Sequence, residues 1–510
     1  MKRLSPAVAP SLTRPQCRIA RMMCLDCAPV LALTEIGDFG EIVLVVSATV
    51  FVALLGMRLA DRFSLPYAAI FLIGAAVIAE FWTHLQRVLS VEDVERIAVV
   101  ALLVILFDGG LHIGLGRLRR SVGPILALGV LGTFLTAGVV ALAAHYVLDF
   151  TWIESGLIGA AIAPTDPAVT FSVFGAREIR GRSGTILEGE AGVNDPVGIA
   201  LMIGMIELAS KDDGSLFVVA EEFAIEMILG LVVGIAGALL LQPVYRRVLL
   251  TGPALYPIRV LAGAGIIYGF AAVLGGSGFL AVFVAGILLG DSAMLRKGEI
   301  ESFHSSIAGV AEIAVFVALG LTISVADLDS VETWAKGLGI AIILAVVARP
   351  LAVFPLLLPA RLSNAERTFI AWGGLKGAVP ILLGALALLA AVDGADELYG
   401  IVFIVVVFSV VVQGTSLTFV ARRLRIPFRR VDHDLAEVLE YVVGETAFAA
   451  GRRVRDLPLG ERAWVGVLIR DGRPHPVEGN VVLDPGDRVH VYAQPEDAAA
   501  IERIFAGPPS

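Results

Sequence analysis

Four polar side chains that can bind a proton or a cation lie close together in one hydrophobic segment. Glu188, Glu190, Asn194 and Asp195 all occur within ILEGEAGVNDPVGIALMIG. An Asp at the centre of a membrane helix costs about 2.5 to 3.5 kcal/mol on insertion scales, so such a group must face a protein interior or a watered cavity. Glu190 and Asn194 are four residues apart and share one helix face, and Asp195 lies next to Asn194 on the adjoining face. This spacing favours a functional site over a purely structural polar cluster.

A second hydrophobic segment, GAAIAPTDPAVTFSVF, carries another acid between two prolines. Pro164 and Pro167 bracket Thr165 and Asp166, and each proline removes a backbone donor and strains the preceding turn. A helix broken at mid-membrane leaves carbonyls and amides free, which is tolerated only where they line a cavity. Unwound carbonyls plus a carboxylate are the usual construction of an ion site in transporters. The alternative is a simple proline kink, in which Asp166 would need some other partner.

A matching interruption occurs much later in the chain, in AWGGLKGAVPILLG, where glycines and a proline surround Lys376. Paired broken segments in corresponding halves of a membrane protein are the best sequence indicator of a transport site. Lys376 would place a positive charge near the unwound helix ends of the Asp166 segment, balancing their dipoles.

A lone arginine, Arg349, lies in the hydrophobic stretch AVVARPLAV. A buried guanidinium must have a carboxylate partner. Glu190 is the first candidate, with Glu188 and Asp166 behind it.

The composition places most of the chain in lipid. The 510 residues are 57% hydrophobic and 17% charged, with a mean hydropathy of +0.84, whereas soluble domains carry about 25% charged residues. The net charge of −9 rules out a broad basic surface, and nucleic acid is therefore not an expected partner.

Hydrophobic runs long enough to cross about 30 Å of hydrocarbon recur along the chain. We predict about thirteen transmembrane helices, at 41–58, 65–81, 95–111, 123–146, 152–172, 184–208, 217–241, 256–274, 279–290, 306–323, 334–358, 366–390 and 397–420. The two interrupted spans are the fifth and the twelfth, which is the separation expected of two six-span inverted repeats joined by an extra seventh span.

The distribution of basic residues supports this count. Loops after odd-numbered spans with their flanking span ends, together with residues 421–430 after the last span, contain 20 Lys and Arg residues, whereas loops after even-numbered spans with their flanking span ends contain 4. One missed span would move every later loop to the other side and abolish the asymmetry. We therefore expect a multi-pass protein of the cell (inner or plasma) membrane, with the N-terminus outside and the C-terminal domain in the cytoplasm.

The two ends of the chain differ from its hydrophobic middle. Residues 1–35 are expected to be a disordered leader or the product of a start assigned too early, and Cys24 and Cys27 in this segment lack the further ligands of a zinc site. The transmembrane domain is expected over 36–422. Residues 432–510 are polar, with strand-like alternation, turn signals at Asp471-Gly472 and at DPGD, and a final helix, which predicts a small cytoplasmic α+β domain.

Several motifs together resemble one transporter family. APTDPAVT, EGEAGVNDPVGIAL, ARPLAV, WGGLKGAV and VQGTSLTFVARRL occur in order across nearly the whole span region. They are similar to the monovalent cation:proton antiporter-1 family, the NhaP-type bacterial relatives of animal sodium/proton exchangers. The resemblance implies an all-α polytopic fold of thirteen helices in two inverted repeats with broken crossing helices, a homodimer, and elevator-like alternating access.

The same resemblance implies roles for individual residues. Asp195 and Asp166 would bind the monovalent cation, and Asp195 would also take the proton. Thr165 would offer an oxygen, and Asn194 and Glu190 would shape the site, with Arg349 holding Glu190. Two positions depart from the family pattern: Ala191 replaces a frequent Ser that could be a ligand, and Lys376 stands where animal exchangers have Arg.

The C-terminal domain resembles the TrkA-C half of regulator-of-potassium-conductance modules, a combination found in bacterial potassium/proton antiporters of the NhaP type. A G-x-G-x-x-G motif after a strand is missing, so we expect no NAD and no other cofactor. The resemblance implies binding of a small-molecule regulator or a dimer clasp, and an inert appendage is the alternative. The domain also favours potassium as the cation.

These features predict a secondary active transporter, not an enzyme, that exchanges K⁺ or Na⁺ for H⁺. A single carboxylate can hold one proton or one monovalent cation, and the Asn-Asp pair resembles the electroneutral branch of the family, so exchange is expected to be one for one. A cation channel or passive carrier is the alternative, and it predicts that Asp195→Asn still conducts. A membrane sensor that does not transport would leave the paired broken helices without a reason.

Overall fold

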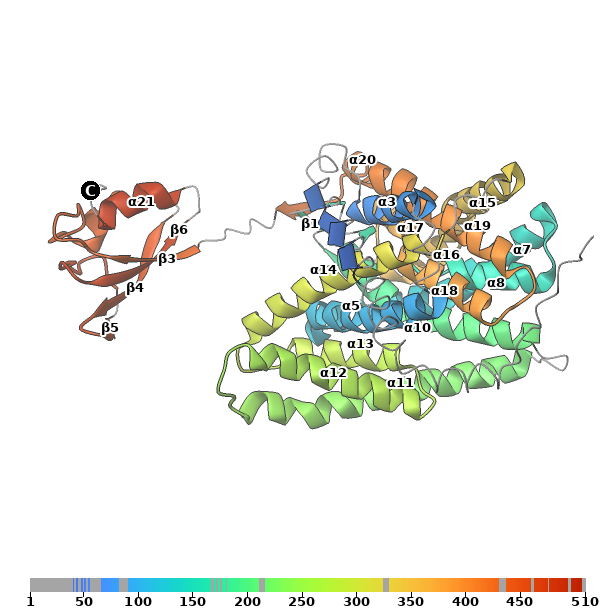
Figure 1. The fold of residues 1–510 in the computed structure, drawn as a ribbon, viewed down its shortest axis with the longest axis horizontal. Coiled ribbons are helices and arrows are strands. Elements are labelled where there is room, and N and C mark those ends of the chain that lie inside the picture. Colours follow the sequence, from blue (N-terminus) through green and yellow to red (C-terminus); the bar gives the residue numbers. More distant parts are fainter. Residues whose placement is uncertain are drawn as a thin grey trace, which may run out of the picture. The chain divides into compact units, whose positions relative to one another are not determined.

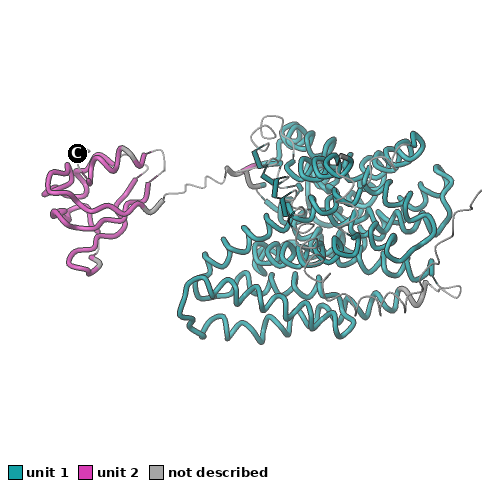
Figure 2. The backbone as a smooth tube through the Cα atoms, viewed as in Figure 1, with its two compact units in different colours: residues 1–174, 179–427 teal, residues 175–178, 428–510 magenta. Residues whose placement is uncertain are grey.

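The computed structural model describes two compact units. They comprise residues 1–174 with 179–427, and residues 175–178 with 428–510 (Figure 2). The described residues are 40, 43, 44, 47, 48, 50, 51, 54, 55, 66–81, 90–166, 169–170, 173–174, 177–179, 181–210, 216–323, 330–430, 437–459, 463–475, 477–493 and 497–506. The predicted leader, most of the predicted first span and Pro167 lie outside this set.

The first unit is mainly a bundle of helices (Figure 1). Its α-helices are α3 (Tyr67–Phe81), α5 (Val91–Arg119), α6 (Val122–Leu126), α7 (Thr133–Leu148), α8 (Trp152–Ile162), α10 (Arg182–Ser210), α11 (Leu216–Arg247), α12 (Leu255–Val273), α13 (Gly278–Gly290), α14 (Lys297–Leu321), α15 (Val331–Ile343), α16 (Arg349–Leu356), α17 (Asn364–Gly373), α18 (Ala378–Leu389), α19 (Ala395–Phe408) and α20 (Thr415–Arg423). Short π-helical segments η1 (Ala127–Gly132), η3 (Leu344–Ala348) and η5 (Ser409–Gly414) join α6 to α7, α15 to α16 and α19 to α20, and a 3₁₀ turn, η4 (Leu358–Ala360), follows α16.

Each predicted span from the second onward overlaps a described helix or a helix group. Among the described residues, eight helices are long and apolar enough to cross a membrane, or nine if the bent pair α17–α18 counts as one span. Helices α5, α11 and α14 are longer than predicted. Their extra turns carry charged residues such as Arg119, Arg247 and Glu299, which a hydropathy window does not assign to a span. The described helices thus establish a multi-pass membrane protein.

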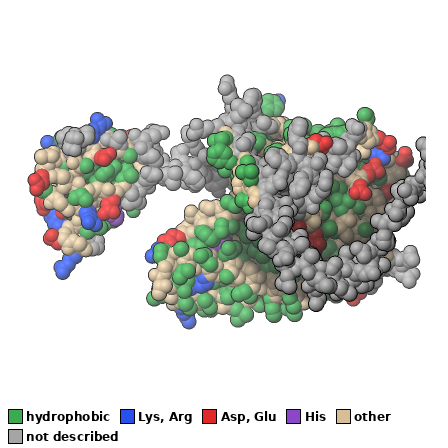
Figure 3. Space-filling view, viewed as in Figure 1, with side chains coloured by type: hydrophobic (Ala, Val, Ile, Leu, Met, Phe, Trp, Pro, Cys, Tyr) green, Lys and Arg blue, Asp and Glu red, His purple; other side chains and the backbone are tan. Residues whose placement is uncertain are grey.

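The outer surface of the bundle is apolar, as contact with lipid requires. Leu240, Ile266 and Val273 expose 74%, 65% and 85% of their surface. Hydrophobic side chains are widespread on the visible face of this unit (Figure 3). A soluble protein rarely leaves so much contiguous apolar surface in water, so these side chains are assigned to the hydrocarbon layer.

Both interrupted spans begin at a capping box. Thr151 accepts a hydrogen bond from the backbone of Glu154, whose side chain bonds back to the Thr151 amide, and α8 starts there. Ser363 and Glu366 make the same reciprocal pair at the start of α17. Each cap provides hydrogen-bond partners for two amides that have none within the helix. Local sequence therefore determines where each half-helix starts.

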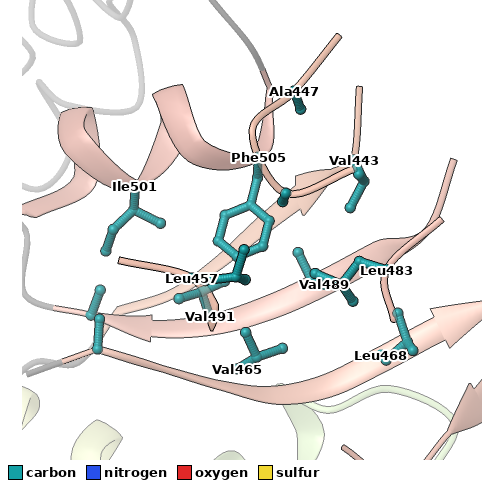
Figure 4. Close-up of a cluster of buried hydrophobic side chains, with 13 residues drawn as sticks. Val443, Ala447, Leu457, Val465, Leu468, Leu483, Val489, Val491, Ile501 and Phe505 are labelled. Carbon is teal, nitrogen blue, oxygen red and sulfur yellow. The ribbon is translucent and has the colours of Figure 1, made fainter. Parts of the chain in front are cut away.

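The second unit contains a four-stranded antiparallel sheet covered by one helix. The strands β3 (Glu437–Val442), β4 (Trp464–Arg470), β5 (Arg473–His475) and β6 (Arg488–Ala493) lie in the order β3-β6-β4-β5. A 3₁₀ turn, η6 (Val454–Asp456), lies between β3 and β4, and helix α21 (Ala498–Phe505) follows β6. Ile501 and Phe505 of α21 point toward Val489 and Val491 of the sheet (Figure 4). The predicted α+β architecture of this region is confirmed.

The predicted hairpin at Asp471-Gly472 joins β4 to β5. Both residues have positive φ, 51° and 73°, as a two-residue primed turn requires. Strands that the sequence did not predict, β1 (Arg177–Ile179) and β2 (Phe428–Arg430), form a separate two-stranded sheet.

Candidate functional site

Two interrupted helices form the framework of the candidate site. Helix α8 ends at Ile162, residues 163–166 are not helical, and helical residues recur at 169–170. Helices α17 and α18 are separated by the non-helical residues 374–377 and are bent by 43° at this break. Each break leaves helix ends whose carbonyls or amides have no partner within their own helix.

Lys376 provides hydrogen bonds to the carbonyls at the C-terminal end of α8. Its side chain is almost fully buried, and its Nζ donates hydrogen bonds to the carbonyls of Ala163 (2.7 Å) and Pro164 (2.8 Å). These carbonyls follow the C-terminus of α8, where the helix dipole carries partial negative charge. The ammonium therefore meets the unwound end of the fifth predicted span, where the sequence led us to expect it.

Asp166 interacts with the N-terminal end of α18. Its Oδ2 accepts a hydrogen bond from the amide of Ala378 at the start of α18 (3.3 Å), where the helix dipole is positive. The Asp166 amide in turn donates to the carbonyl of Leu375 (2.8 Å). The residue at position 377 must be Gly, because a Cβ there would lie 1.8 Å from Asp166 Oδ2. Asp166 and Lys376 thus tie the two breaks together.

Helix α10 brings Asn194 and Asp195 to the same place. It runs without interruption through Pro196. Asn194 Nδ2 donates a hydrogen bond to Thr165 Oγ1 (2.7 Å). Asp195 is 3% exposed, and its Oδ1 has no hydrogen-bond partner among the described residues. A buried polar atom without a partner is uncommon in folded proteins, and an exchangeable ligand is one explanation for it.

Asp166 and Asp195 line one internal cavity of about 40 Å³. A water molecule needs roughly 10–15 Å³ of such volume, so the space accommodates a small hydrated group. The other lining residues are mostly apolar, and the charged ones are acidic: Glu188 of α10 and Glu312 of α14. Thr165, Asn194 and Lys376 are not among the residues that line the cavity.

Arg349 pairs with Glu190, the first of its candidate partners. Arg349 Nη1 and Nη2 donate to the two carboxylate oxygens of Glu190 at 2.6 and 3.4 Å, and both side chains are at most 2% exposed. Nη2 also reaches the carbonyl of Ile370 in α17 (3.4 Å). A Cβ at Gly374 would lie 2.2 Å from Nη2. This pair joins α10, α16 and α17 beside the cavity.

Glu312 lines the cavity and Tyr67 contacts Glu312, and neither residue was predicted from the sequence. Glu312 is buried on α14, and its Oε2 accepts a hydrogen bond from the Tyr67 hydroxyl of α3 (3.4 Å). The available signal was a single acid in the apolar run AGVAEIAVFVALG of the predicted tenth span. That acid has no proline or second polar residue beside it, which is why it attracted no attention.

The sequence model of the family described as "Sodium/hydrogen exchanger, transmembrane" matches residues 47–423, well over half of the chain. The chain belongs to this family. A TrkA-C domain matches residues 438–506. The motif resemblance noted from the sequence is confirmed by both matches.

Relatives of this chain carry transporter names. "K(+)/H(+) antiporter NhaP2" of Shewanella sp. (strain ANA-3) is 31% identical over 425 residues, covering 80% of this chain and 74% of the relative. "K(+)/H(+) antiporter NhaP" of Alkalimonas amylolytica is 28% identical and covers 91% and 83%. "Na(+)/H(+) antiporter NhaH" of Halobacillus aidingensis is 27% identical and covers 76% and 98%. These names are those of antiporters rather than enzymes.

The helical unit also has the fold of a solved structure. The sodium proton antiporter MjNhaP1 from Methanocaldococcus jannaschii, at pH 8, superposes with a TM-score of 0.62 at 23% identity, covering 74% of this chain and 99% of that protein. The likeness shows an NhaP-like fold.

Proposed function

We propose that this exchanger family member is a secondary active antiporter that exchanges K⁺ or Na⁺ for H⁺, one for one. The observation that supports it most is the pair of carboxylates, Asp166 and Asp195, facing one small buried cavity where two broken helices meet. Asp195 is the group that holds either the proton or the cation. Asp166 is the second carboxylate ligand, and Thr165 and Asn194 hold the Asp195 turn of α10 against the α8 break.

The neighbouring contacts stabilise the other buried charged groups near the site. Glu190 is paired with Arg349 and Lys376 with backbone carbonyls, so neither residue is needed to carry a proton. The unpaired Asp195 oxygen then belongs to the group that exchanges its ligand. An empty, charged Asp195 is costly to move through a low-dielectric region. Only the loaded forms cross, and exchange becomes obligatory.

We infer thirteen spans arranged as two inverted repeats. The broken helices belong to the fifth and twelfth predicted spans, and both start at capping boxes. The π-helical segments η1 and η3 lie in the fourth and eleventh predicted spans, again seven apart. The excess of basic residues in loops on one side supports a cytoplasmic C-terminal domain. On this proposal the protein is a homodimer of the cell membrane, works by alternating access, and is regulated by a small molecule at its TrkA-C domain.

Proton flux in everted membrane vesicles tests the exchange. K⁺, Na⁺ or Li⁺ added to acidified vesicles should dissipate the pH gradient when the wild-type protein is present. Asp195→Asn should reduce the rate of this proton efflux by at least about a hundredfold, as loss of a proton-transfer group does. Potassium is the first cation to test, because two of the relatives named above are K⁺/H⁺ antiporters.

Asp393→Asn is the matched control, because Asp393 is exposed and lies in the turn after α18. Antiport is refuted if no cation moves protons in the wild type, or if Asp195→Asn matches it. Cation flux without proton movement would indicate a channel or passive carrier instead. One-for-one exchange in proteoliposomes should not respond to an imposed membrane potential, and a clear response would refute the stoichiometry.

A further inference from the structure

Glu312 is a buried carboxylate on the cavity that the proposed exchange mechanism does not use. It lies in the second half of α14 and is 6% exposed. The residues that follow it, Ile313 to Leu321, contain no charged side chain. A carboxylate at this depth is expensive to keep and marks a functional position by default.

The surroundings of Glu312 are acidic rather than basic. The charged residues that line the cavity with it are Asp166, Asp195 and Glu188. Its Oε2 accepts the hydrogen bond from Tyr67, while Oε1 is buried and has no hydrogen-bond partner among the described residues. A buried carboxylate on a cavity whose described lining residues include no cationic side chain attracts a cation strongly, because the low dielectric screens the charge poorly.

Glu312 also approaches the cavity from a different set of helices. Helix α14 packs against α3 and α5, whereas Asp195 is on α10 and Asp166 follows α8. Among the described residues, no three His, Cys, Asp or Glu side chains are placed to chelate one ion together. Glu312 therefore lines the same cavity from a helix separate from those that carry Asp195 and Asp166.

A structural role for Glu312 would be to join α14 to α3 through Tyr67. That role does not require a carboxylate, since a glutamine carbonyl accepts the same hydrogen bond. The bond is also long, at 3.4 Å, and leaves the second oxygen without a partner. The contact with Tyr67 therefore explains how Glu312 is oriented but not why it is an acid.

We propose that Glu312, oriented by Tyr67, is a transit site for the transported monovalent cation. The cation entering the cavity is first held by the Glu312 carboxylate and the Tyr67 hydroxyl oxygen, and then passes to Asp166 and Asp195. This inference rests on the proposed exchange function and deepens it. It makes Glu312 a determinant of cation affinity that lies outside the exchanging pair.

Exchange kinetics at several cation concentrations test this role. Glu312→Gln keeps the size of the side chain and its hydrogen-bond acceptor but removes the charge. We expect it to raise the KM for the cation by roughly tenfold, the size of one lost charge-assisted contact, with a maximal rate close to the wild-type rate. Glu312→Asp should restore part of the affinity, and Tyr67→Phe should raise KM by a smaller factor.

Glu301→Gln is the control on the same helix, because Glu301 is 38% exposed and pairs with Lys297 at 3.5 Å. It should leave both kinetic constants unchanged. A lower maximal rate with unchanged KM in Glu312→Gln would show a structural role and overturn the proposal. If that variant does not fold, an unchanged KM in both Glu312→Asp and Tyr67→Phe overturns it equally.

A thermal shift measurement separates this inference from the proposed function. In purified Asp195→Asn protein, titration with K⁺ or Na⁺ should still raise the melting temperature, and adding Glu312→Gln should abolish the increase. Loss of the shift in Asp195→Asn alone would contradict a separate transit site. If the wild type lacks cation-driven proton movement, the proposed function is wrong. If the wild type exchanges normally and Glu312→Gln leaves the KM for the cation unchanged, only the transit site is contradicted.

Discussion

Arg349 and Lys376 are both almost completely buried, and the protein balances their charges in different ways. Arg349 faces the carboxylate of Glu190 in a bidentate pair, whereas Lys376 is held by two backbone carbonyls at the end of α8. Removing one partner of a buried pair leaves an uncompensated charge, and this costs more than the pair itself is worth. Both residues therefore maintain the site without touching the cavity.

Arg349→Met tests the ion pair. The substitution leaves the Glu190 carboxylate, which is 1% exposed, without its cationic partner. We therefore expect the free energy of unfolding to fall by about 3–5 kcal/mol. The measurements are the melting temperature and the yield of folded protein in detergent, both of which should decrease. The double variant Arg349→Met with Glu190→Gln should recover most of this loss. Arg96→Met is the control, since the Arg96–Glu92 pair is exposed and should contribute less than about 1 kcal/mol. Equal effects of the two single variants would contradict the assigned role.

At the scale of elements, the two broken helices complement each other. The C-terminal end of α8 receives the Lys376 ammonium, and the N-terminal end of α18 receives the Asp166 carboxylate. Each charge is supplied by the partner break, so neither helix end is satisfied alone. The Thr170 hydroxyl adds a further link, because it donates to the carbonyl of Gly373 at the end of α17 (2.8 Å). These contacts between the two breaks hold the carboxylate of Asp166 at the cavity wall.

Gly377→Ala should disturb this arrangement directly. The added Cβ would lie 1.8 Å from Asp166 Oδ2, so the carboxylate must leave the start of α18. A displacement of about 1 Å can cost a hundredfold in rate, and we expect a loss of that order in cation-driven proton flux with folded protein retained. Gly265→Ala in α12 is the control, because a Cβ there meets nothing within 4 Å. Wild-type flux in Gly377→Ala would refute the position of Asp166 described above.

The whole molecule divides into a membrane unit and a polar unit with its own core. The second unit buries a cluster that includes Val489, Val491, Ile501 and Phe505. It also contains a charged cluster, in which Arg470 donates to both oxygens of Asp487 at 2.8 and 2.6 Å. The hydrogen bonds from Arg470 hold the pKa of Asp487 below its usual range. A group of this kind stabilises the fold only while it is ionised.

Acid should therefore weaken the second unit. Because the folded pKa of Asp487 is depressed, its contribution is present above its unfolded pKa of about 3.9 and is lost as pH falls through the lower, folded pKa. Hydrogen exchange of peptides from 437–506 in the full-length protein should show less protection at pH 3 than at pH 6. Asp487→Asn should lose about 1–2 kcal/mol at neutral pH and show a flatter dependence on pH.

Glu440→Gln is the control for this experiment, because the Glu440–Arg488 pair is exposed and 3.7 Å long. It should change neither the protection at pH 6 nor its dependence on pH. If Asp487→Asn retains the pH dependence of the wild type, the acid sensitivity has another origin.

Much of the candidate site could be recognised from the sequence alone, for a physical reason. Lipid makes polar groups so costly that Asp166, Asp195 and Arg349 stand out wherever they occur in an apolar run. Prolines and glycines likewise mark the two breaks, because their effect on the helix is local. The family, the helical spans and the α+β character of the second unit follow from patterns of this local kind.

Tertiary structure decided which of these groups meet. The Lys376 ammonium finds carbonyls 212 and 213 residues away, and Arg349 finds Glu190 rather than Glu188 or Asp166; spacing along the chain does not determine such distant contacts. Glu312 was overlooked for the same reason. As a lone acid it carries little signal, and its importance comes from the cavity it shares with Asp166 and Asp195, which exists only once helices from distant parts of the chain have packed together.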